Sequence, residues 1–331
     1  MTKTMRPLDN ETGEVPEKTI ELVSSRATIA GFGALAVILA VGLIVAVDFA
    51  ARPGGEAQVA AAGAAENHFK DISLVAKSAI VVDIAERKVL FAKNPDVQLP
   101  LASLTKVPLA LVVSEVLPPD SMLTLSRNMF QVGYPDQLLA GQRWRVRDVL
   151  DFTLAASSNE GADILAGVAG ESLRAKYRDA SSESPALWRM NDLAEKLGLS
   201  ATHFLNVTGL DVSTTLAGAY GSARDMALLF AYAGETNPEA FSATTRGDVT
   251  LTSRDGVRVN VHNTNLLERE IPGLILGKTG FTDLAGGNLA VVFDVGIARP
   301  VVAVVLGSTP TERFNDIQKL VEATRNAIAS E

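Results

Sequence analysis

The alternation of apolar and polar positions divides the greater part of the chain into strands and helices. Two short apolar segments, Ala79–Ile84 and Val89–Phe91, flank the four residues Ala85–Lys88, and this pattern predicts a β-hairpin. Further along, apolar residues recur with the period of an α-helix. The predicted helices are Leu104–Leu117, Arg147–Ala156, Glu160–Ala169, Asn191–Leu197, Ala223–Ala233 and a final amphipathic helix at 311–329.

Strand patterns return in the last third of the chain. The predicted strands are Val257–Val261, Leu274–Lys278, Asn288–Val295 and Val301–Leu306. Strands at both ends of this region, with helices between them, predict an α+β fold whose antiparallel sheet joins the two ends. Ser222, followed three residues later by Asp225, resembles a capping box that opens the helix from Ala223.

An uncharged, strongly apolar segment at 27–47 precedes this region. About 20 apolar residues cross a hydrocarbon core about 30 Å thick when they form a helix. The segment has no polar stripe, is longer than the apolar part of a typical signal peptide, and follows 26 mostly polar residues. These features favour a transmembrane anchor, whereas the Ala-rich stretch near Ala60 keeps a cleaved signal peptide open.

Basic residues are more frequent before the apolar segment than shortly after it. Four of them, at positions 3, 6, 18 and 26, precede it, and Arg52 follows. This bias predicts a cytoplasmic N-terminus and an extracytoplasmic remainder, in a single-pass protein of the cytoplasmic membrane. We expect a tail at 1–26, the span at 27–47, an Ala/Gly-rich linker at 48–70 and one globular domain at 71–331.

Composition excludes several classes of function. The chain of 331 residues has a formal net charge of −8, which argues against a nucleic-acid partner because phosphates attract a basic surface. It contains no Cys, so disulfides, thiolate metal sites and Cys nucleophiles are excluded. Its histidines, His68, His203 and His262, lack a zinc-hydrolase spacing, and we expect no metal or other cofactor. A hydrolase with so few histidines is expected to use another general base.

The first candidate site, Ser103-Leu104-Thr105-Lys106, sets a hydroxyl and an amine one helical turn apart. A lysine amine accepts the serine proton when burial or a second cation lowers its pKa from about 10.4 toward neutrality. The alternative is an N-cap serine followed by an ordinary surface lysine. A catalytic role is favoured because no other serine in the chain has a lysine three residues later and because the following helix is apolar.

The second candidate is Ser157-Ser158-Asn159, between two predicted helices. From such a loop, Ser157 can relay a proton and Asn159 can hold a substrate amide. The alternative is a helix cap, a position that Ser and Asn favour. Ser126-Arg127-Asn128 has the same spacing, so the pattern alone does not decide.

The third candidate, Lys278-Thr279-Gly280, stands at the end of a predicted strand. Lys278 would supply the second cation that lowers the pKa of Lys106. Thr279 would offer a hydroxyl to a substrate carboxylate, and Gly280 would let a substrate lie close to the backbone. The alternative is a polar turn after a strand.

The three patterns S-x-x-K, S-x-N and K-T-G, in this order, resemble the serine penicillin-recognising enzymes. The residues around them resemble the D-alanyl-D-alanine carboxypeptidases, the low-molecular-mass penicillin-binding proteins. This narrower resemblance is carried by Leu99–Lys106, Asn191–Ala194, Leu197–Leu199, Ala201–Phe204, Asn206 with Gly209–Asp211, Asn263–Leu267 and Gly277–Asp283. It covers the chain from about residue 77 to the end.

The resemblance implies a β-lactamase/transpeptidase-like fold, with an antiparallel sheet flanked by a terminal helix and a helical subdomain. It implies that Ser103 is the acylated nucleophile, that Lys106 is its base and that Ser157 completes the catalytic group. The oxyanion hole would be the backbone N–H groups of Ser103 and Phe281. His203 is expected to be structural. The implied substrate-binding residues are Asn159, Lys278, Thr279, Gly280, Phe281 and Arg313.

The expected function is that of a membrane-anchored serine D,D-carboxypeptidase. It would remove the terminal D-Ala from peptidoglycan pentapeptides, and β-lactam antibiotics would inhibit it covalently. The alternatives are a D,D-endopeptidase or β-lactamase on the same scaffold, and a non-catalytic cell-wall-binding relative. Ser158 and Glu160 depart from the S-G-N-D sequence that is frequent in the family, and the predicted anchor precedes the domain where many members carry one after it.

Overall fold

A computed structural model describes residues 68–129, 138–180, 183–296 and 298–331. Within these ranges no helix combines the length and apolar character needed to cross a bilayer. The predicted tail, the predicted span at 27–47 and nearly all of the predicted linker lie outside the described residues. The domain boundaries and the membrane location therefore stay predictions.

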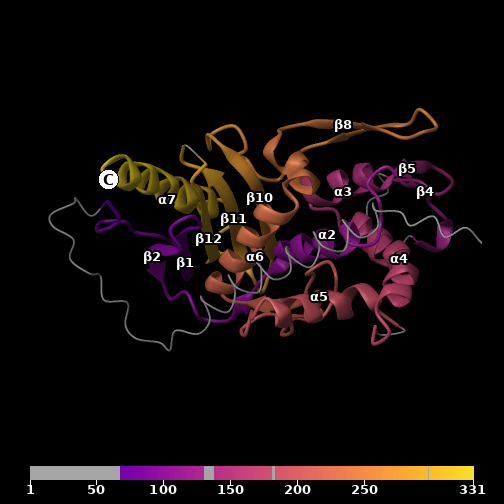
Figure 1. Cartoon of the computed structure of the whole chain (residues 1–331), viewed down its shortest axis with the longest axis horizontal. Helices are drawn as coiled ribbons and strands as arrows, with labels where there is room; N and C mark the ends of the chain where they lie inside the picture. Colours follow the sequence, from indigo (N-terminus) through magenta and orange to yellow (C-terminus); the bar gives the residue numbers. More distant parts are fainter. Residues whose placement is uncertain (1–67, 130–137, 181–182, 297) are drawn as a thin grey trace, which may run out of the picture. The chain divides into compact units, whose positions relative to one another are not determined.

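A five-stranded antiparallel sheet joins the two ends of the described region, in the order β10-β11-β12-β1-β2 (Figure 1). Its first and last strands along the chain lie side by side, with Ser78 opposite Leu306 and Asp83 opposite Val301. The predicted hairpin and the predicted joining of the ends are thus confirmed. The strands are β1 (Ser78–Asp83), β2 (Lys88–Lys93), β10 (Leu274–Thr282), β11 (Gly286–Asp294) and β12 (Pro300–Ser308).

Helices cover both faces of this sheet because its inner strands are apolar on both sides. On one face, Val81 and Ala303 pack with Ile317 of the terminal helix. Ile80 and Val304 point to the other face and join the larger core. The period of two along each strand separates these two sets of side chains. The covering helices are α7 (Glu312–Ala329) on the first face and α6 (Ala223–Thr236) on the second.

The remaining helices form a second group around α2 (Lys106–Ser114), whose residues are buried from Lys106 to Val113. Burial on all sides explains why the sequence of this helix lacks a polar stripe. Ser222 accepts a hydrogen bond from the Asp225 backbone N–H, as the capping pattern predicted. The other helices are α3 (Val146–Ala155), α4 (Asn159–Lys176), α5 (Pro185–Lys196), and the 3₁₀ helices η1 (Ala102–Thr105), η2 (Arg127–Met129) and η3 (Pro238–Thr245).

Three small sheets complete the described structure. Of their strands only β9 was predicted, as Val257–Val261, and the other strands of two to four residues carry too little alternation to be recognised. They are β3 (Leu99–Pro100) with β7 (Ala219–Gly221) and β6 (His203–Phe204), β4 (Met122–Thr124) with β5 (Arg143–Arg145), and β8 (Val249–Thr252) with β9 (Arg258–Val261).

Two predicted boundaries were wrong in ways that matter for the site. Strand β10 continues to Thr282, opposite Gly286, so the Lys278-Thr279-Gly280 segment lies inside a strand and not at its end. The helix predicted from Leu104 opens with a 3₁₀ turn, η1, and becomes α-helical at Lys106. Ser103 therefore lies in the tight turn that leads into α2.

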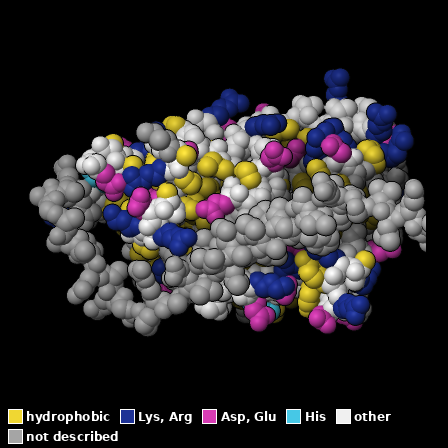
Figure 2. Space-filling model, viewed as in Figure 1, with side chains coloured by type: hydrophobic (Ala, Val, Ile, Leu, Met, Phe, Trp, Pro, Cys, Tyr) yellow, Lys and Arg dark blue, Asp and Glu magenta, His cyan; other side chains and the backbone are white. Residues whose placement is uncertain are grey.

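Charged side chains of both signs are interspersed over the face shown in Figure 2. Several arginines of the protein belong to ion pairs, such as Arg143 with Asp255 at 2.6 Å and Arg147 with Asp120 at 3.0 Å. Interspersed charges of both signs do not form a continuous basic patch on the part of this face that the structure describes.

Candidate active site

Ser103 is held in place by the strand before it and by a buried side chain of the central sheet. Leu99 and Pro100 pair with β7, and the next residues turn into η1. Asn288, fully buried in β11, donates from Nδ2 to the carbonyl oxygens of Pro100 and Leu101 at 2.9 and 3.1 Å. The backbone leading to Ser103 is thereby fixed against the sheet, while Ser103 itself is half-buried.

Lys106 makes three polar contacts through its amine. Its Nζ lies 2.8 Å from Ser103 Oγ, 2.7 Å from Asn159 Oδ1 and 2.7 Å from the carbonyl oxygen of Thr208. The side chain is completely buried, and this burial lowers its pKa from 10.5 to about 7, against an opposing attraction from Asp163. A lysine with this pKa is partly neutral near pH 7 and can act as a base.

Ser157 lies in the short connection between α3 and α4. Ser158 caps α4 by accepting a hydrogen bond from the Gly161 N–H, so Asn159 begins the helix with its side chain at Lys106. Ser157 has a φ of 58°, in the left-handed region, which costs a non-glycine residue about 1–3 kcal/mol. This backbone places its hydroxyl 2.8 Å from Lys278 Nζ.

Lys278 is buried in β10 and donates to Ser157 Oγ and to the carbonyl oxygen of Thr279. Its pKa is lowered well below the usual value, first by burial and then by repulsion from Lys106 and Arg313. Burial is the largest cause of the lowered pKa of Lys106, and it is one of the two causes that the sequence predicted. Repulsion between the two amines, the other predicted cause, lowers the pKa of Lys278 and is a property of the pair.

Thr279 has a hydroxyl partner that the sequence did not indicate. Thr264 Oγ1 lies 2.6 Å from Thr279 Oγ1, and Thr264 is itself held by its backbone N–H, which donates to the Ala155 carbonyl oxygen at 3.0 Å. When Thr264 donates to Thr279, the Thr279 proton is left to point at a ligand.

Gly280, Phe281 and Arg313 form the outer part of the same group. A Cβ added at Gly280 would lie 2.8 Å from the Leu101 carbonyl oxygen and 3.2 Å from the Ser103 nitrogen, so β10 passes directly beside Ser103. Arg313, in the first turn of α7, donates to the Gly280 carbonyl oxygen at 2.9 Å, and burial lowers its pKa. Phe281, the next residue of β10, is half exposed.

The structure therefore brings all nine predicted site residues into one connected group. It also adds three that sequence reasoning missed: Thr208, Thr264 and Asn288. Asn288 had a usable signal, since it is the polar residue at the start of an apolar strand. Thr208 acts through its backbone carbonyl, which leaves no mark in the sequence.

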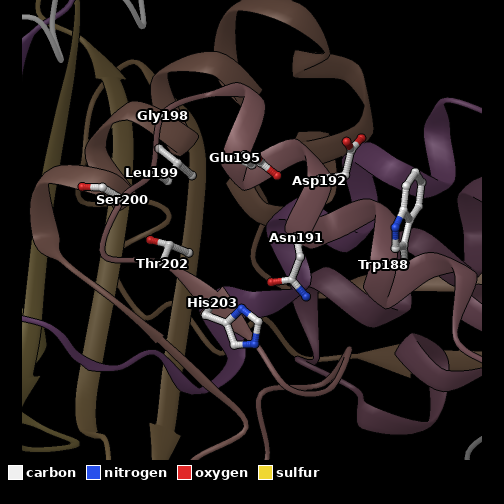
Figure 3. A pocket seen from close by; sticks show the side chains of 9 residues that line it. All are labelled: Trp188, Asn191, Asp192, Glu195, Gly198, Leu199, Ser200, Thr202 and His203. Carbon is white, nitrogen blue, oxygen red and sulfur yellow. The ribbon is translucent and has the colours of Figure 1, made fainter. Parts of the chain in front are cut away.

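A separate open hollow of about 710 Å³ lies between α5 and β6 (Figure 3). None of the nine predicted residues lines it. Asp192 on its wall is engaged by Arg189 and Lys196, and Asn191 bonds to the backbone of Phe204. His203 lies at the rim with an exposed side chain. The bonds from Asn191 hold α5 to β6.

The sequence matches the family model described as D-alanyl-D-alanine carboxypeptidase over residues 64–310. The D-alanyl-D-alanine carboxypeptidase DacC of Escherichia coli (strain K12) is 33% identical over 268 residues, which cover 78% of this chain and 63% of that one. This chain thus spans less than two thirds of that relative's length. A D-alanyl-D-alanine endopeptidase of the same strain is 29% identical over 273 residues, 81% of each chain.

A solved structure gives the same likeness in three dimensions. Penicillin-Binding Protein D2 from Listeria monocytogenes, in the ampicillin-bound form, has a TM-score of 0.63 at 30% identity, over 76% of this chain and 98% of that one. The fold of the described region is thus that of the penicillin-binding proteins, β-lactamase/transpeptidase-like with mixed α and β content. Because the family model matches the greater part of this chain, the chain belongs to the D-alanyl-D-alanine carboxypeptidase family.

Proposed function

We propose that the protein is a serine D,D-carboxypeptidase that removes the terminal D-Ala from peptidoglycan stem peptides. The observation that carries this proposal is the 2.8 Å contact between Ser103 Oγ and a completely buried Lys106 whose pKa is lowered to about 7. The neutral amine takes the hydroxyl proton while Ser103 attacks the carbonyl carbon.

Ser103 Oγ attacks the carbonyl of the penultimate D-Ala and forms a tetrahedral intermediate with a negatively charged oxygen. The backbone N–H groups of Ser103 and Phe281 are the proposed donors to it, which is supported by the close passage of β10 beside Ser103. One such donor is worth about 3–4 kcal/mol in the transition state.

Collapse of the intermediate breaks the peptide C–N bond and leaves an ester on Ser103. The leaving nitrogen needs a proton, and Ser157 can pass one to it because its hydroxyl is hydrogen-bonded to the Lys278 amine. D-Ala departs as the amino acid. Water then attacks the ester and gives one proton to Ser157, which replaces the proton lost to the leaving nitrogen. Lys106 returns its proton to Ser103 as the stem peptide leaves with a new carboxylate.

Selectivity for a peptide end follows from the charges beside Ser103. Lys278 and Arg313 are close enough for repulsion to lower the pKa of Lys278. A substrate carboxylate that entered next to them would relieve this repulsion and raise the pKa of Lys278 again. The Thr279 hydroxyl offers it a further hydrogen bond. These groups favour a substrate that ends in a free carboxylate.

A fluorescent penicillin and a D-Ala release assay test the proposal together. Penicillin-Binding Protein D2 from Listeria monocytogenes has been solved in ampicillin-bound and cefotaxime-bound forms, and we expect this chain to be acylated by such β-lactams. Ser103→Ala should abolish both labelling and D-Ala release from a pentapeptide. Ser126→Ala, in the other S-x-N pattern, is the control and should retain both. Labelling that survives Ser103→Ala would refute the assignment.

A D,D-endopeptidase is the second candidate function, favoured by the endopeptidase of Escherichia coli among the relatives. Both reactions use the same acyl-enzyme, and they differ in whether the leaving group is free D-Ala or a crosslinked peptide. Comparing a pentapeptide with a crosslinked muropeptide under identical conditions separates them. Rapid nitrocefin turnover would indicate a β-lactamase instead, and muropeptide binding without any turnover would indicate a non-catalytic relative.

We propose further that the apolar segment 27–47 anchors the protein in the cytoplasmic membrane with the catalytic domain outside. The support is its length, its lack of charge and the basic residues before it. The full chain should sediment with membranes, and external protease should degrade the catalytic domain in spheroplasts. Recovery in the soluble fraction, with the N-terminal segment removed, would indicate a cleaved signal peptide.

A further inference from the structure

The loop after β6 carries Asn206-Val207-Thr208-Gly209, to which the proposed reaction assigns no role. Its backbone nevertheless reaches the catalytic group, because the carbonyl oxygen of Thr208 accepts a hydrogen bond from Lys106 Nζ at 2.7 Å. Thr208 is 4% exposed and Lys106 is completely buried. The loop therefore seals the base from solvent and contacts its reacting atom.

The hydrogen-bonding capacities of the three partners of Lys106 fix the direction of its lone pair. Asn159 Oδ1 and the Thr208 carbonyl oxygen can only accept, whereas Ser103 Oγ can donate. A neutral amine has two N–H groups, and these satisfy the two acceptors. The lone pair is then directed at the Ser103 hydroxyl, the geometry in which it takes the proton.

Asn206 holds the Thr208 carbonyl in this position. Its Oδ1 accepts hydrogen bonds from the backbone N–H of Thr208 and Gly209 at 3.2 and 2.7 Å, and from Thr208 Oγ1 at 3.1 Å. Its Nδ2 donates to the Leu210 carbonyl oxygen at 2.9 Å. One amide thus satisfies four groups of the loop.

The loop is also fixed by close packing. Gly209 has a φ of 81°, and a Cβ there would overlap the Ala102 carbonyl oxygen, one residue before the nucleophile. A Cβ at Gly218 would overlap the Asn206 amide. The loop is packed too closely to shift as a whole, so the hydrogen bonds of Asn206 determine the direction of the Thr208 carbonyl.

We propose that Asn206 is a positioning residue for the general base: its side-chain oxygen folds the loop so that the Thr208 carbonyl, together with Asn159, orients the amine of Lys106 toward Ser103. This inference rests on the proposed serine mechanism. It concerns the acylation step, and so it applies whichever D-Ala-containing peptide is the substrate.

Acylation of the full chain by a fluorescent penicillin, followed as a function of pH, tests the role. Asn206→Ala removes all four bonds and should lower the maximal acylation rate by about 10–100-fold, the size expected when a base is misplaced by about 1 Å. Asn206→Asp keeps an oxygen for the three bonds to Thr208 and Gly209. It should retain the maximal rate within about threefold, and its carboxylate should move the acidic limb to higher pH by raising the pKa of Lys106.

Asn191→Ala is the matched control. Asn191 is buried to a similar degree and makes three side-chain bonds, to the Leu187 carbonyl oxygen and to the N–H and carbonyl of Phe204, but none reaches Lys106. It should lower the melting temperature and leave the acylation rate of the folded protein unchanged.

Three results would overturn the proposal: an Asn206→Ala rate within twofold of the original, equal losses in the Asp and Ala variants, or an equal loss in Asn191→Ala. If the unaltered protein were acylated by penicillin but released no D-Ala, the carboxypeptidase assignment would fail while the role of Asn206 could still be measured. If Ser103 were not acylated at all, the carboxypeptidase assignment and the proposed role of Asn206 would both be refuted.

Discussion

The central sheet and the catalytic group beside it are built on opposite principles. In β1, β11 and β12 most residues are buried and apolar, with Ser78, Asp83 and Asn288 among the polar exceptions, and alternate side chains supply two cores. In the neighbouring strand β10, the buried side chains include an amine and a hydroxyl. The sheet is stabilised by many apolar contacts, and another apolar side chain of similar size can replace each of them. The site depends on a few hydrogen bonds, and each of these requires one particular donor and acceptor.

This difference predicts that stability and activity can be changed separately. A buried amine is costly to the fold because burial penalises its charge, and the lowered pKa of Lys106 records that cost. A buried aliphatic side chain in the sheet stabilises the fold and takes no part in the chemistry. Substitutions in the site should therefore lower the acylation rate without lowering the stability of the fold. Substitutions in the sheet should lower the stability and leave the acylation rate unchanged.

The largest expected effect comes from Lys106→Met. Acylation should fall by about 10²–10⁴-fold, because the base is lost while the shape of the side chain is roughly kept. The melting temperature should stay the same or rise, since an apolar side chain replaces a buried amine. Stopped-flow acylation and thermal unfolding of the same sample measure both. A variant that loses activity and stability together would break the contrast between the two regions.

The next effect is the pH dependence of acylation. Lys106 must be neutral to act as a base, and its pKa of about 7 means that the neutral form is lost as the pH falls below 7. The rate should drop about tenfold per unit there, hence about 100-fold between pH 8 and pH 5. Circular dichroism should confirm that the protein stays folded over this range. A rate that continues to rise steeply above pH 9 would indicate a lysine with an ordinary pKa.

Val304→Ala probes the sheet. Val304 is completely buried, with Ile80 and Ala290 opposite it on the neighbouring strands. Loss of two methyl groups should lower the free energy of unfolding by about 2 kcal/mol. The acylation rate of the folded protein should be unchanged. Urea denaturation measures the first quantity, and a changed acylation rate would show that the sheet tunes the site.

The smallest effect is expected from Thr264→Val, which removes the hydroxyl beside Thr279 and keeps the shape. Thr279 then loses its hydroxyl partner; in the arrangement in which Thr264 donates to Thr279, this partner leaves the Thr279 proton for the substrate carboxylate. KM for a pentapeptide should rise about tenfold with kcat nearly unchanged. Thr264→Ser should restore the original value. If kcat falls instead, Thr264 acts on the chemical step.

The sequence allowed the nine site residues to be predicted because nearly all of them lie in short motifs whose spacing is local. Ser103 and Lys106 are one turn apart, and Lys278, Thr279 and Gly280 are consecutive. The hairpin β1–β2 and the long strands were likewise visible from apolar runs. Such features depend on neighbouring residues and are therefore visible in the sequence. Taken singly, the three motifs left alternatives open, and the roles of the nine residues followed from the family resemblance that the order and surroundings of the motifs carry.

The remainder depends on residues far apart in the chain. The Thr208 carbonyl at Lys106 and the amide of Asn288 at Pro100 and Leu101 are contacts between distant segments. A local pattern marks Asn288 as a polar residue in an apolar strand, but no local pattern identifies the partners of either group. The source of the pKa shift was also hidden, because Lys106 lies in an apolar helix whose depth becomes known only when α2 is packed. Burial, one of the two causes considered from the sequence, is the larger cause of that lowered pKa.

The pairing of β1 with β12 also has a consequence for biosynthesis. β1 lies inside the sheet, yet one of its two neighbours, β12, is synthesised much later than β1 itself. The nucleophile lies in the early part, and the strand that passes beside it, β10, is made late. A growing chain therefore holds Ser103 and Lys106 without their surroundings. Such long-range pairing delays folding until β10 and β12 have been made, so a nascent chain that lacks these strands is expected to be unfolded and inert.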